Sequence, residues 1–392
     1  MLQAAYVYHP DSLNYVFRRD HPFDQRRLVM TMELLEQVHS LNTNDIHIPA
    51  TPLDERLLQS VHIPAYVETV KQLSLPSPVE PYVSQAGQYG LDVEETPFFP
   101  GMHRSASAIA AASVHAAELV MSGKAAHALH LGGGLHHALP QKGAGFCIYN
   151  DASIAIRYIR EQYGAKVLYI DTDVHHGDGV EMSFYTDPNV FTYSIHETGK
   201  YLFPGTGRVE ERGAGEGFGC TVNVPVEPYT EDDSWLECFS NVLEQVLECA
   251  RPDVIVSQHG CDAHALDPLS HIHCSMRIYR EMPKLIHEAA HRYCNGRWVA
   301  LGGGGYDIWR VVPRAWSLLW LEMSGHPLLA DIDRHPLLPL PAGWLTRWQR
   351  ESPLELPNTW LDDVSRWEPM PRRSEITEHN RHICELASSY LK

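Results

Sequence analysis

The segment 171–179 concentrates acidic and imidazole side chains directly after a run of apolar residues. Asp171, Asp173 and His175 alternate along the chain, so in an extended backbone their side chains point to the same side. Burying carboxylates without compensation is costly, whereas a bound cation relieves that cost. Carboxylate oxygens and imidazole nitrogens are normal ligands of zinc. The pattern therefore predicts a metal site, in preference to a polar turn capped by aspartates.

A second segment, 259–268, follows another apolar run and could bring a distant carboxylate to the same site. Asp262 and Asp267 are both candidates, and the spacing does not choose between them. Because Asp267 precedes a proline, the competing interpretation for that residue is the cap of a turn or helix.

Two glycine-rich segments complete the candidate chemistry. Three glycines at 132–134 precede the pair His136 and His137, which could transfer protons to a ligand that the flexible backbone approaches closely. Four glycines at 302–305 precede Tyr306. No Lys-Ser/Thr pair follows, so a phosphate-binding loop is not predicted. A tyrosine in this place could instead donate a hydrogen bond to an oxyanion.

Each of these segments comes after a short apolar run typical of a buried strand, and helix-like stretches separate several of the runs. The expected strands are 128–131, 166–170, 190–195, 253–257 and 298–301, and the expected helices are 104–122, 151–163 and 234–250. Alternation of this kind predicts an α/β fold with a central parallel sheet covered by helices on both faces. In such sheets the chemistry lies at the carboxyl ends of the strands.

Composition excludes several classes of protein. The chain has 392 residues, with Lys+Arg 31 against Asp+Glu 49 and a net charge of −18, so general nucleic-acid binding is not expected. The charge favours a basic partner, such as a lysine-rich segment or a polyamine. No membrane span and no secretory signal are predicted. The 8 cysteines are scattered without a Cys-x-x-Cys pair, which indicates a reducing cytoplasm.

The last part of the chain differs in composition from the rest. Residues 336–392 combine recurrent prolines with four tryptophans, and they end in a helix-like stretch at 374–390. Tryptophans favour an extension packed on the main body over a solvated linker. We therefore expect a single catalytic domain at 1–335 and a packed C-terminal extension at 336–392.

Taken together, the motifs resemble the histone deacetylase family, within the arginase/deacetylase fold, and are most similar to bacterial acetoin-utilisation deacetylases. The resemblance covers nearly the whole chain. It rests on His21-Pro22, Arg27, Pro100-Gly101, 133–138, 145–147, 171–179, 200–207, 259–268 and 302–306.

The resemblance implies roles for these residues. The zinc ligands would be Asp173, His175 and Asp267. The tandem histidines would be His136 as electrostatic partner and His137 as general base and acid, with Asp171 and Asp178 orienting them. Tyr306 would polarise the substrate carbonyl, and Arg27 would lie below the active site. A structural potassium ion, also implied, would be held by Asp171, Asp173, His175, Ser194 and Ile195.

A substrate tunnel is implied as well. Its residues would be Gly145, Phe146 and Phe203, with Leu135 where many members have an aromatic residue and Cys274 where relatives carry Met or Leu. The rim acid that clamps the substrate backbone would be Glu95, with Asp92 and Glu94 as rivals.

The implied activity is zinc-dependent hydrolysis of N6-acetyl-lysine or acyl-lysine in proteins, with an acyl-CoA synthetase as a plausible cytoplasmic target. The alternative that keeps the chemistry is hydrolysis of an acetylated polyamine. A ureohydrolase with two manganese ions and an inactive acyl-lysine-binding scaffold are the more distant alternatives. Iron could replace zinc, since the affinities of divalent metals overlap.

Overall fold

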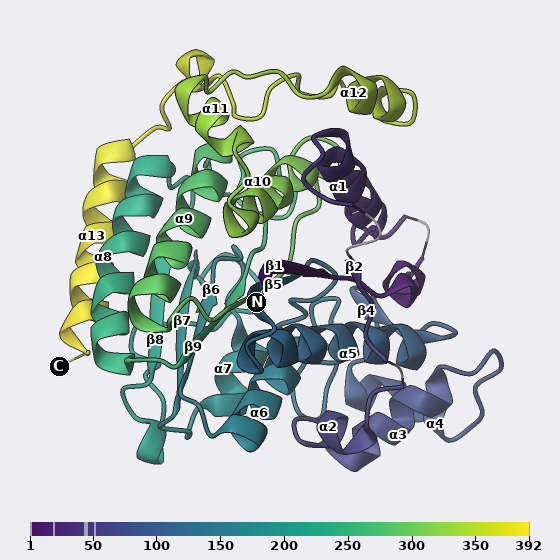
Figure 1. Cartoon of the computed structure of the whole chain (residues 1–392). Coiled ribbons are helices and arrows are strands. Elements are labelled where there is room, and N and C mark those ends of the chain that lie inside the picture. The colour runs from purple at the N-terminus through teal and green to yellow at the C-terminus, as the bar shows by residue number, and fades with distance from the viewer. Residues whose placement is uncertain (1, 19, 43–45, 51, 392) are drawn as a thin grey trace.

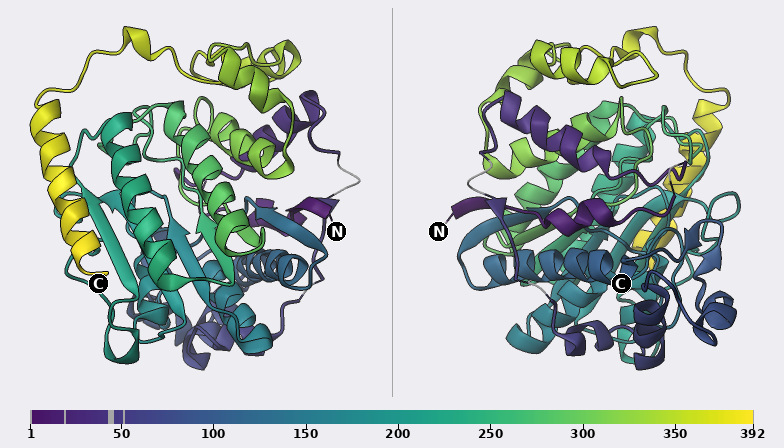
Figure 2. Two further views of the ribbon diagram at one scale, coloured as in Figure 1. Left: turned by 60° about the vertical axis from the view of Figure 1, so that its left-hand side comes forward. Right: turned by 90° about the vertical axis from the view of Figure 1, so that its right-hand side faces the viewer.

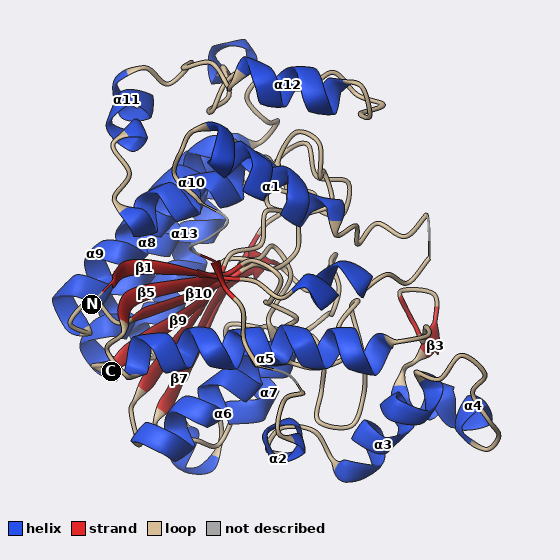
Figure 3. Cartoon of the chain, turned by 45° about the vertical axis from the view of Figure 1, so that its right-hand side comes forward, coloured by secondary structure: helices blue, strands red, loops and turns tan. Residues whose placement is uncertain are grey.

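Short apolar runs form the strands of one parallel sheet in the computed structural model, which describes residues 2–18, 20–42, 46–50 and 52–391. The spatial order is β2-β1-β5-β10-β9-β6-β7-β8, and every neighbouring pair is parallel (Figure 3). The strands are β1 (Leu2–Val7), β2 (Ile46–His47), β5 (Ala125–His130), β6 (Val167–Asp171), β7 (Val190–Glu197), β8 (Thr221–Val226), β9 (Val254–Gln258) and β10 (Trp298–Leu301). The five strands expected from the sequence and the predicted fold class are confirmed.

Helices cover both faces of the sheet (Figures 1 and 2). Alternating side chains of the strands pack into these two helical layers. In β6, Leu168 and Ile170 join one core while Val167 and Tyr169 join the other. The first layer comprises α1 (Arg26–Gln37), α8 (Asp232–Ala250), α9 (Met276–Tyr293) and α10 (Val312–Ser324). The second comprises α5 (Met102–Met121), α6 (Asp151–Tyr163) and α7 (Asp178–Phe184). Burial of both faces explains why the strands read as continuous apolar runs.

A group of short elements beside α5 forms a third core with the loop at 143–149. Tyr66 donates a hydrogen bond to the carbonyl of Ile148, and Tyr15 donates one to the carbonyl of Phe146, both of 2.7 Å. The elements are η1 (Pro10–Asn14), α2 (Glu55–Gln59), α3 (Pro64–Leu73), α4 (Tyr82–Gln85), η3 (Ala86–Tyr89) and the antiparallel pair β3 (Asp92–Val93) and β4 (Thr96–Pro97). The remaining short element, η4 (Gly215–Gly217), lies between β7 and β8.

The C-terminal part of the chain runs across the first helical layer (Figure 1). Trp344 is buried, and its indole N–H donates to the carbonyl of Met30. The side chain of Asn380 is also buried and bonds Thr230 and the backbone N–H of Glu227, so that the last helix packs on α8 and β8. The elements are α11 (Leu328–Arg334), α12 (Ala342–Gln349), η5 (Val364–Arg366) and α13 (Arg373–Ser389). The division at 335 remains a prediction. Among the described residues, no helix is long and apolar enough to cross a membrane.

The order of the strands brings the predicted motifs together. β5, β10, β9 and β6 are consecutive neighbours in the sheet. Their carboxyl ends lead into the segments with the paired histidines, Tyr306, Asp262 and Asp173, respectively. Segments that are far apart in the sequence therefore meet at one edge, as expected for a parallel sheet.

Candidate active site

Three buried side chains at this edge bring their ligand atoms together. Nδ1 of His175 lies 3.1 Å from Oδ1 of Asp173 and 3.1 Å from Oδ2 of Asp262. The three donor atoms all lie within 4.8 Å of one another. Asp173 and His175 follow β6, and Asp262 follows β9. Two oxygens and one imidazole nitrogen converge on the same small volume.

This donor set fits a divalent cation. Burial and the charge of Asp173 raise the pKa of Asp262 to about 6, because two carboxylates are held side by side away from water. A Cβ on Gly260 would lie 2.1 Å from Oδ2 of Asp173, so the glycine leaves the space that this carboxylate occupies. Asp173 also accepts hydrogen bonds from the backbone N–H of Gly304 and from Gln258. Hydrogen bonds orient these carboxylates, and a bound dication would remove the repulsion between them. Both properties are typical of a metal site.

The geometry places Asp262, and not the predicted ligand Asp267, in the cluster with Asp173 and His175. Both oxygens of Asp267 are used elsewhere: Oδ2 accepts the backbone N–H of Tyr306 at 2.7 Å, and Oδ1 accepts that of Leu269 at 3.0 Å. Asp262 instead presents Oδ2 to His175, and its Oδ1 accepts the backbone N–H of Val174. The sequence offered both acids, and the resemblance was applied to the wrong one.

The paired histidines lie beside this cluster, each with its own acid. Nδ1 of His136 is 2.8 Å from Oδ2 of Asp171, and Nδ1 of His137 is 2.7 Å from Oδ1 of Asp178. Burial alone lowers the pKa of His136, but the charges of Asp171 and Asp173 outweigh it and raise the pKa to about 9. Burial and the charge of His136 lower the pKa of His137 to about 4. The pKa values of the two adjacent imidazoles are thus shifted in opposite directions.

The histidine loop is fixed by two residues that the sequence analysis did not single out. Asp151 accepts hydrogen bonds from the backbone N–H groups of Gly134 and Leu135. The amide of Asn150 donates to the carbonyls of His136 and Ala138, and its oxygen caps the first turn of α6. In the sequence, an Asn-Asp pair at a helix start indicates only helix capping. The support that the two side chains give to the histidine loop could not be inferred from it.

Arg27 holds the loop that carries Tyr306. Its guanidinium is buried and donates to the carbonyls of Gly303 at 2.9 Å and Gly305 at 3.1 Å. Phe23 and Trp316 lie against it, at 4.2 Å and 4.9 Å from the ring centroids. The predicted place of Arg27 below the site therefore corresponds to a clamp on the glycine loop, and its charge also interacts with Asp262 and Asp173.

Aromatic rings flank the approach to the histidines and Tyr306. The ring of Phe203 lies 4.9 Å from that of His137, and the ring of Phe146 lies 5.6 Å from that of Tyr306. Gly145 has a φ of +50°, and a Cβ there would lie 2.4 Å from His137 and 2.8 Å from Phe203. These positions suit the walls of a narrow passage.

Two predicted tunnel residues lie deeper than expected. Cys274 is fully buried in the core, with Sγ directed at the carbonyl of Thr230, so the structure removes it from the lining. Cys274 directly precedes Ser275, the N-cap residue of α9, and at the start of this helix its side chain points into the core. Leu135 is almost completely buried in the third core. Leu269, half-buried beside Asp267, is the apolar side chain that the same loop offers instead.

The rim candidates belong to the β3–β4 hairpin. All three acids are exposed; Glu94 pairs with Arg18, whereas the backbone carbonyl of Glu95 contacts His21. Thr96 accepts the backbone N–H of Phe146, which joins the hairpin to the tunnel wall. Glu95 remains the predicted rim acid, with Asp92 and Glu94 as rivals.

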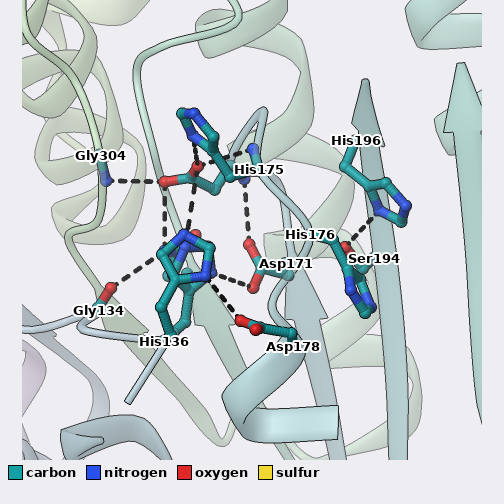
Figure 4. A network of polar contacts seen from close by, with 12 residues as sticks. Gly134, His136, Asp171, His175, His176, Asp178, Ser194, His196 and Gly304 are labelled. Carbon is teal, nitrogen blue, oxygen red and sulfur yellow. Dashed lines mark hydrogen bonds and ion pairs between the residues drawn. The ribbon is translucent and has the colours of Figure 1, made fainter. Parts of the chain in front are cut away.

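The predicted potassium ligands lie at the end of β6, in the loop that follows it, and within β7. Asp171 and Ser194 are register partners across these strands, and Ile195 follows. The hydroxyl of Ser194 is 2.8 Å from Nδ1 of His196, whose Nε2 faces the carbonyl of Gly207 (Figure 4). This contact fixes the loop that carries Phe203. Potassium binding itself stays a prediction.

A parallel α/β sheet with acid-paired histidines beside a cluster of metal-type ligands defines a hydrolase of the deacetylase kind. The chain belongs to the histone deacetylase family, because the protein-family model described as histone deacetylase domain matches residues 21–323. It is 47% identical over 388 residues to the acetoin utilization protein AcuC of Bacillus subtilis, covering 99% of this chain and 97% of that protein. AcuC of Staphylococcus xylosus is 44% identical over 389 residues, covering 99% and 98% of the two chains. The crystal structure of an HDAC homolog from Aquifex aeolicus shares the fold, with a TM-score of 0.81, 24% identity and coverage of 98% and 99%.

Proposed function

We propose that this enzyme is a zinc-dependent deacylase of N6-acetyl-lysine side chains in proteins, releasing free lysine and acetate. The observation that carries the proposal is the convergence of Asp173, His175 and Asp262 beside the paired histidines and the loop of Tyr306. Three protein ligands leave a metal position open for substrate, as in catalytic zinc sites.

Zinc, when bound, supplies a Lewis acid for the amide carbonyl and makes a water molecule easier to deprotonate. His137 donates its Nδ1–H to Asp178, which leaves the lone pair of Nε2 free to take a proton from that water. The same nitrogen then returns a proton to the departing lysine amine. His136, held by Asp171, stabilises the negative charge that develops. The hydroxyl of Tyr306 donates to the oxyanion, an interaction worth about 2.7–4 kcal/mol in comparable sites.

The passage between Phe146 and Phe203 suits an extended side chain with an uncharged acyl end. The net charge of −18 supports attraction of a lysine-rich surface. We propose a cytoplasmic protein substrate, such as an acylated acyl-CoA synthetase, and a structural potassium ion at Asp171 and Ser194. An acetylated polyamine is the second candidate substrate, because the same charge favours any cation.

The test is acetate release from an acetyl-lysine peptide by zinc-loaded enzyme, beside the Tyr306→Phe variant and an acetylspermidine competitor. We expect the variant to lower kcat by about 100- to 1,000-fold while metal content is unchanged. If acetylspermidine inhibits hydrolysis of the peptide at concentrations below that of the peptide, an acetylated polyamine is favoured as the substrate. Zinc-loaded wild type that releases no acetate from either compound would overturn the proposal.

A further inference from the structure

A second group of imidazoles converges far from the active-site edge. Nε2 of His287 lies 3.1 Å from Nε2 of His127 and 3.1 Å from Nε2 of His291. All three nitrogens lie within 4.8 Å of one another. His127 stands near the start of β5, whereas the active-site histidines follow the end of that strand. His287 and His291 belong to α9, which lies between α8 and α10 (Figure 1).

The two helical histidines have a spacing that is used for metal binding. Residues 287–291 read His-Glu-Ala-Ala-His, and side chains four residues apart share one face of a helix. The H-E-x-x-H pattern on a helix is a known zinc-binding arrangement. The third imidazole, His127, comes from a strand 160 residues earlier. Distance along the chain hid this cluster from the sequence analysis.

Hydrogen bonding alone leaves the cluster unsatisfied. The Nδ1–H of His287 donates to Oε1 of Glu322 at 2.7 Å, and the same carboxylate is paired with Arg280 at 2.9 Å. Nε2 of His287 carries either one lone pair or one proton, so it can form a good hydrogen bond with only one of its two imidazole neighbours. A cation that accepts all three Nε2 lone pairs removes the conflict.

The geometry also matches a metal ion. Zinc–nitrogen bonds of about 2.0–2.1 Å in a tetrahedron place two ligand nitrogens about 3.3 Å apart. The two separations of 3.1 Å are close to this value. A carboxylate on the far nitrogen of a ligating imidazole, as Glu322 provides for His287, fixes the tautomer and the ring orientation. Burial and the neighbouring imidazoles lower the pKa of His127 to about 4, which keeps that ring neutral and able to bind.

We propose that His127, His287 and His291 form a second metal site that takes a transition-metal dication suited to imidazole ligands, such as zinc, nickel, cobalt or copper. Three neutral nitrogens without a carboxylate ligand distinguish it chemically from the active-site cluster. His291 is exposed, so an ion can enter from solvent and keep a water ligand there. The ion would tie β5 to α9 and stabilise the folded state.

The test uses full-length protein without a polyhistidine tag, equilibrated at buffered free zinc. Wild type, His291→Gln and the matched control His382→Gln, at an exposed position on α13, are compared by metal analysis and thermal unfolding. We expect His291→Gln to hold one zinc equivalent fewer than wild type and the control. Its unfolding temperature in EDTA should equal that of wild type, and it should gain less from added zinc. Glu322→Gln should weaken the same equivalent about 10- to 100-fold.

A second arm separates the two sites. Asp262→Asn, which disrupts the active-site cluster, should keep the equivalent that His291→Gln loses, and cobalt absorption should report it there. Equal metal content in wild type and His291→Gln, with both proteins folded, would overturn the proposal. This outcome is independent of whether the enzyme hydrolyses acetyl-lysine.

Discussion

The backbone N–H of Tyr306 donates a hydrogen bond of 2.7 Å to Oδ2 of Asp267. The other oxygen of this carboxylate accepts the N–H of Leu269. Burial and the charge of Asp262 raise the pKa of Asp267 to about 8. Asp267 therefore joins the loop after β9 to the loop after β10 and sets the position from which Tyr306 acts. It is a positioning residue, distinct from the neighbouring acid that faces His175.

Substitution of the two acids should separate these roles. Asp262→Asn removes a ligand oxygen of the cluster, so the protein should lose the zinc equivalent bound there and its turnover with it. Asp267→Asn replaces one acceptor oxygen by an amide donor, so at least one of the three backbone hydrogen bonds that this side chain accepts is lost. Zinc content should stay at the wild-type level in this variant while kcat falls about 10- to 100-fold. Metal analysis of both variants in a His291→Gln background measures the zinc at this cluster alone. Loss of zinc in Asp267→Asn with zinc retained in Asp262→Asn would contradict the two assigned roles.

Arg27→Met should lower kcat substantially while changing the free energy of unfolding only modestly. The substitution removes the two hydrogen bonds to the carbonyls of Gly303 and Gly305, but it also removes a buried charge whose desolvation is costly. We expect a change in unfolding free energy of about 1–3 kcal/mol and a loss in kcat of about tenfold or more, since the loop of Tyr306 is released. Arg26→Met is the control, because Arg26 pairs with Asp24 at the surface. Equal losses of kcat in both variants would refute the role of the clamp.

Gly145→Ala should block turnover through a clash with the paired histidine. Its Cβ would lie 2.4 Å from His137 and 2.8 Å from Phe203, and the φ of +50° adds strain. Gly164→Ala is the matched control, with a φ of +62° and no atom within 4 Å of the added Cβ. Both variants should lose about 1–2 kcal/mol of stability. Only Gly145→Ala should lose activity, on the order of 100-fold, and steady-state kinetics with the acetyl-lysine peptide measure the difference.

His62 contributes to instability in acid. Its buried ring faces the carbonyl of Leu139 through Nδ1 and accepts the backbone N–H of Asn150 through Nε2, so the neutral form is required. Burial lowers the pKa of His62 from 6.5 to about 4. Between these values the unfolded chain binds a proton that the folded protein excludes. The folded state is therefore fully favoured above pH 6.5 and loses about 3 kcal/mol from this residue as the pH falls to 4.

The check is the free energy of unfolding in urea between pH 7 and pH 4. His62→Gln should be less stable at pH 7 but should show a pH slope smaller by up to one proton in this window. His382→Gln should keep the wild-type slope. An unchanged slope in His62→Gln would mean that the folded protein protonates this ring as readily as the unfolded chain does.

The sequence predicted the sheet and most of the site because both are local patterns. A β-branched run followed by glycine, acid or histidine marks a strand and the functional loop after it, as at Asp171 and Tyr306. The choice between Asp262 and Asp267 is not local. It depends on which carboxylate the loop turns toward His175, and on which one the N–H of Tyr306 captures.

The same limit applies to residues that act through the backbone or through distant partners. Asp151 supports the histidine loop by accepting backbone N–H groups, and an aspartate at a helix start has no sequence feature that reveals this role. Cys274 has the right place in the chain for a tunnel residue, but the helix that follows draws it into the core. His127 shows no motif of its own and meets His287 only through packing of α9 on the sheet.

The contact of α13 with β8 has a consequence for the behaviour of the chain in solution. β8 ends the sheet, so one side of it has no strand partner in the part of the chain that the structure describes, and Pro225 within it lacks an N–H. Unpaired strand edges recruit other chains into intermolecular sheets. Asn380 holds Glu227, the residue after β8, and α13 contacts the strand itself, so we expect the last helix to shield this border from intermolecular pairing. Loss of the C-terminal residues by proteolysis would then be seen first as self-association, before any change in the chemistry at the opposite strands.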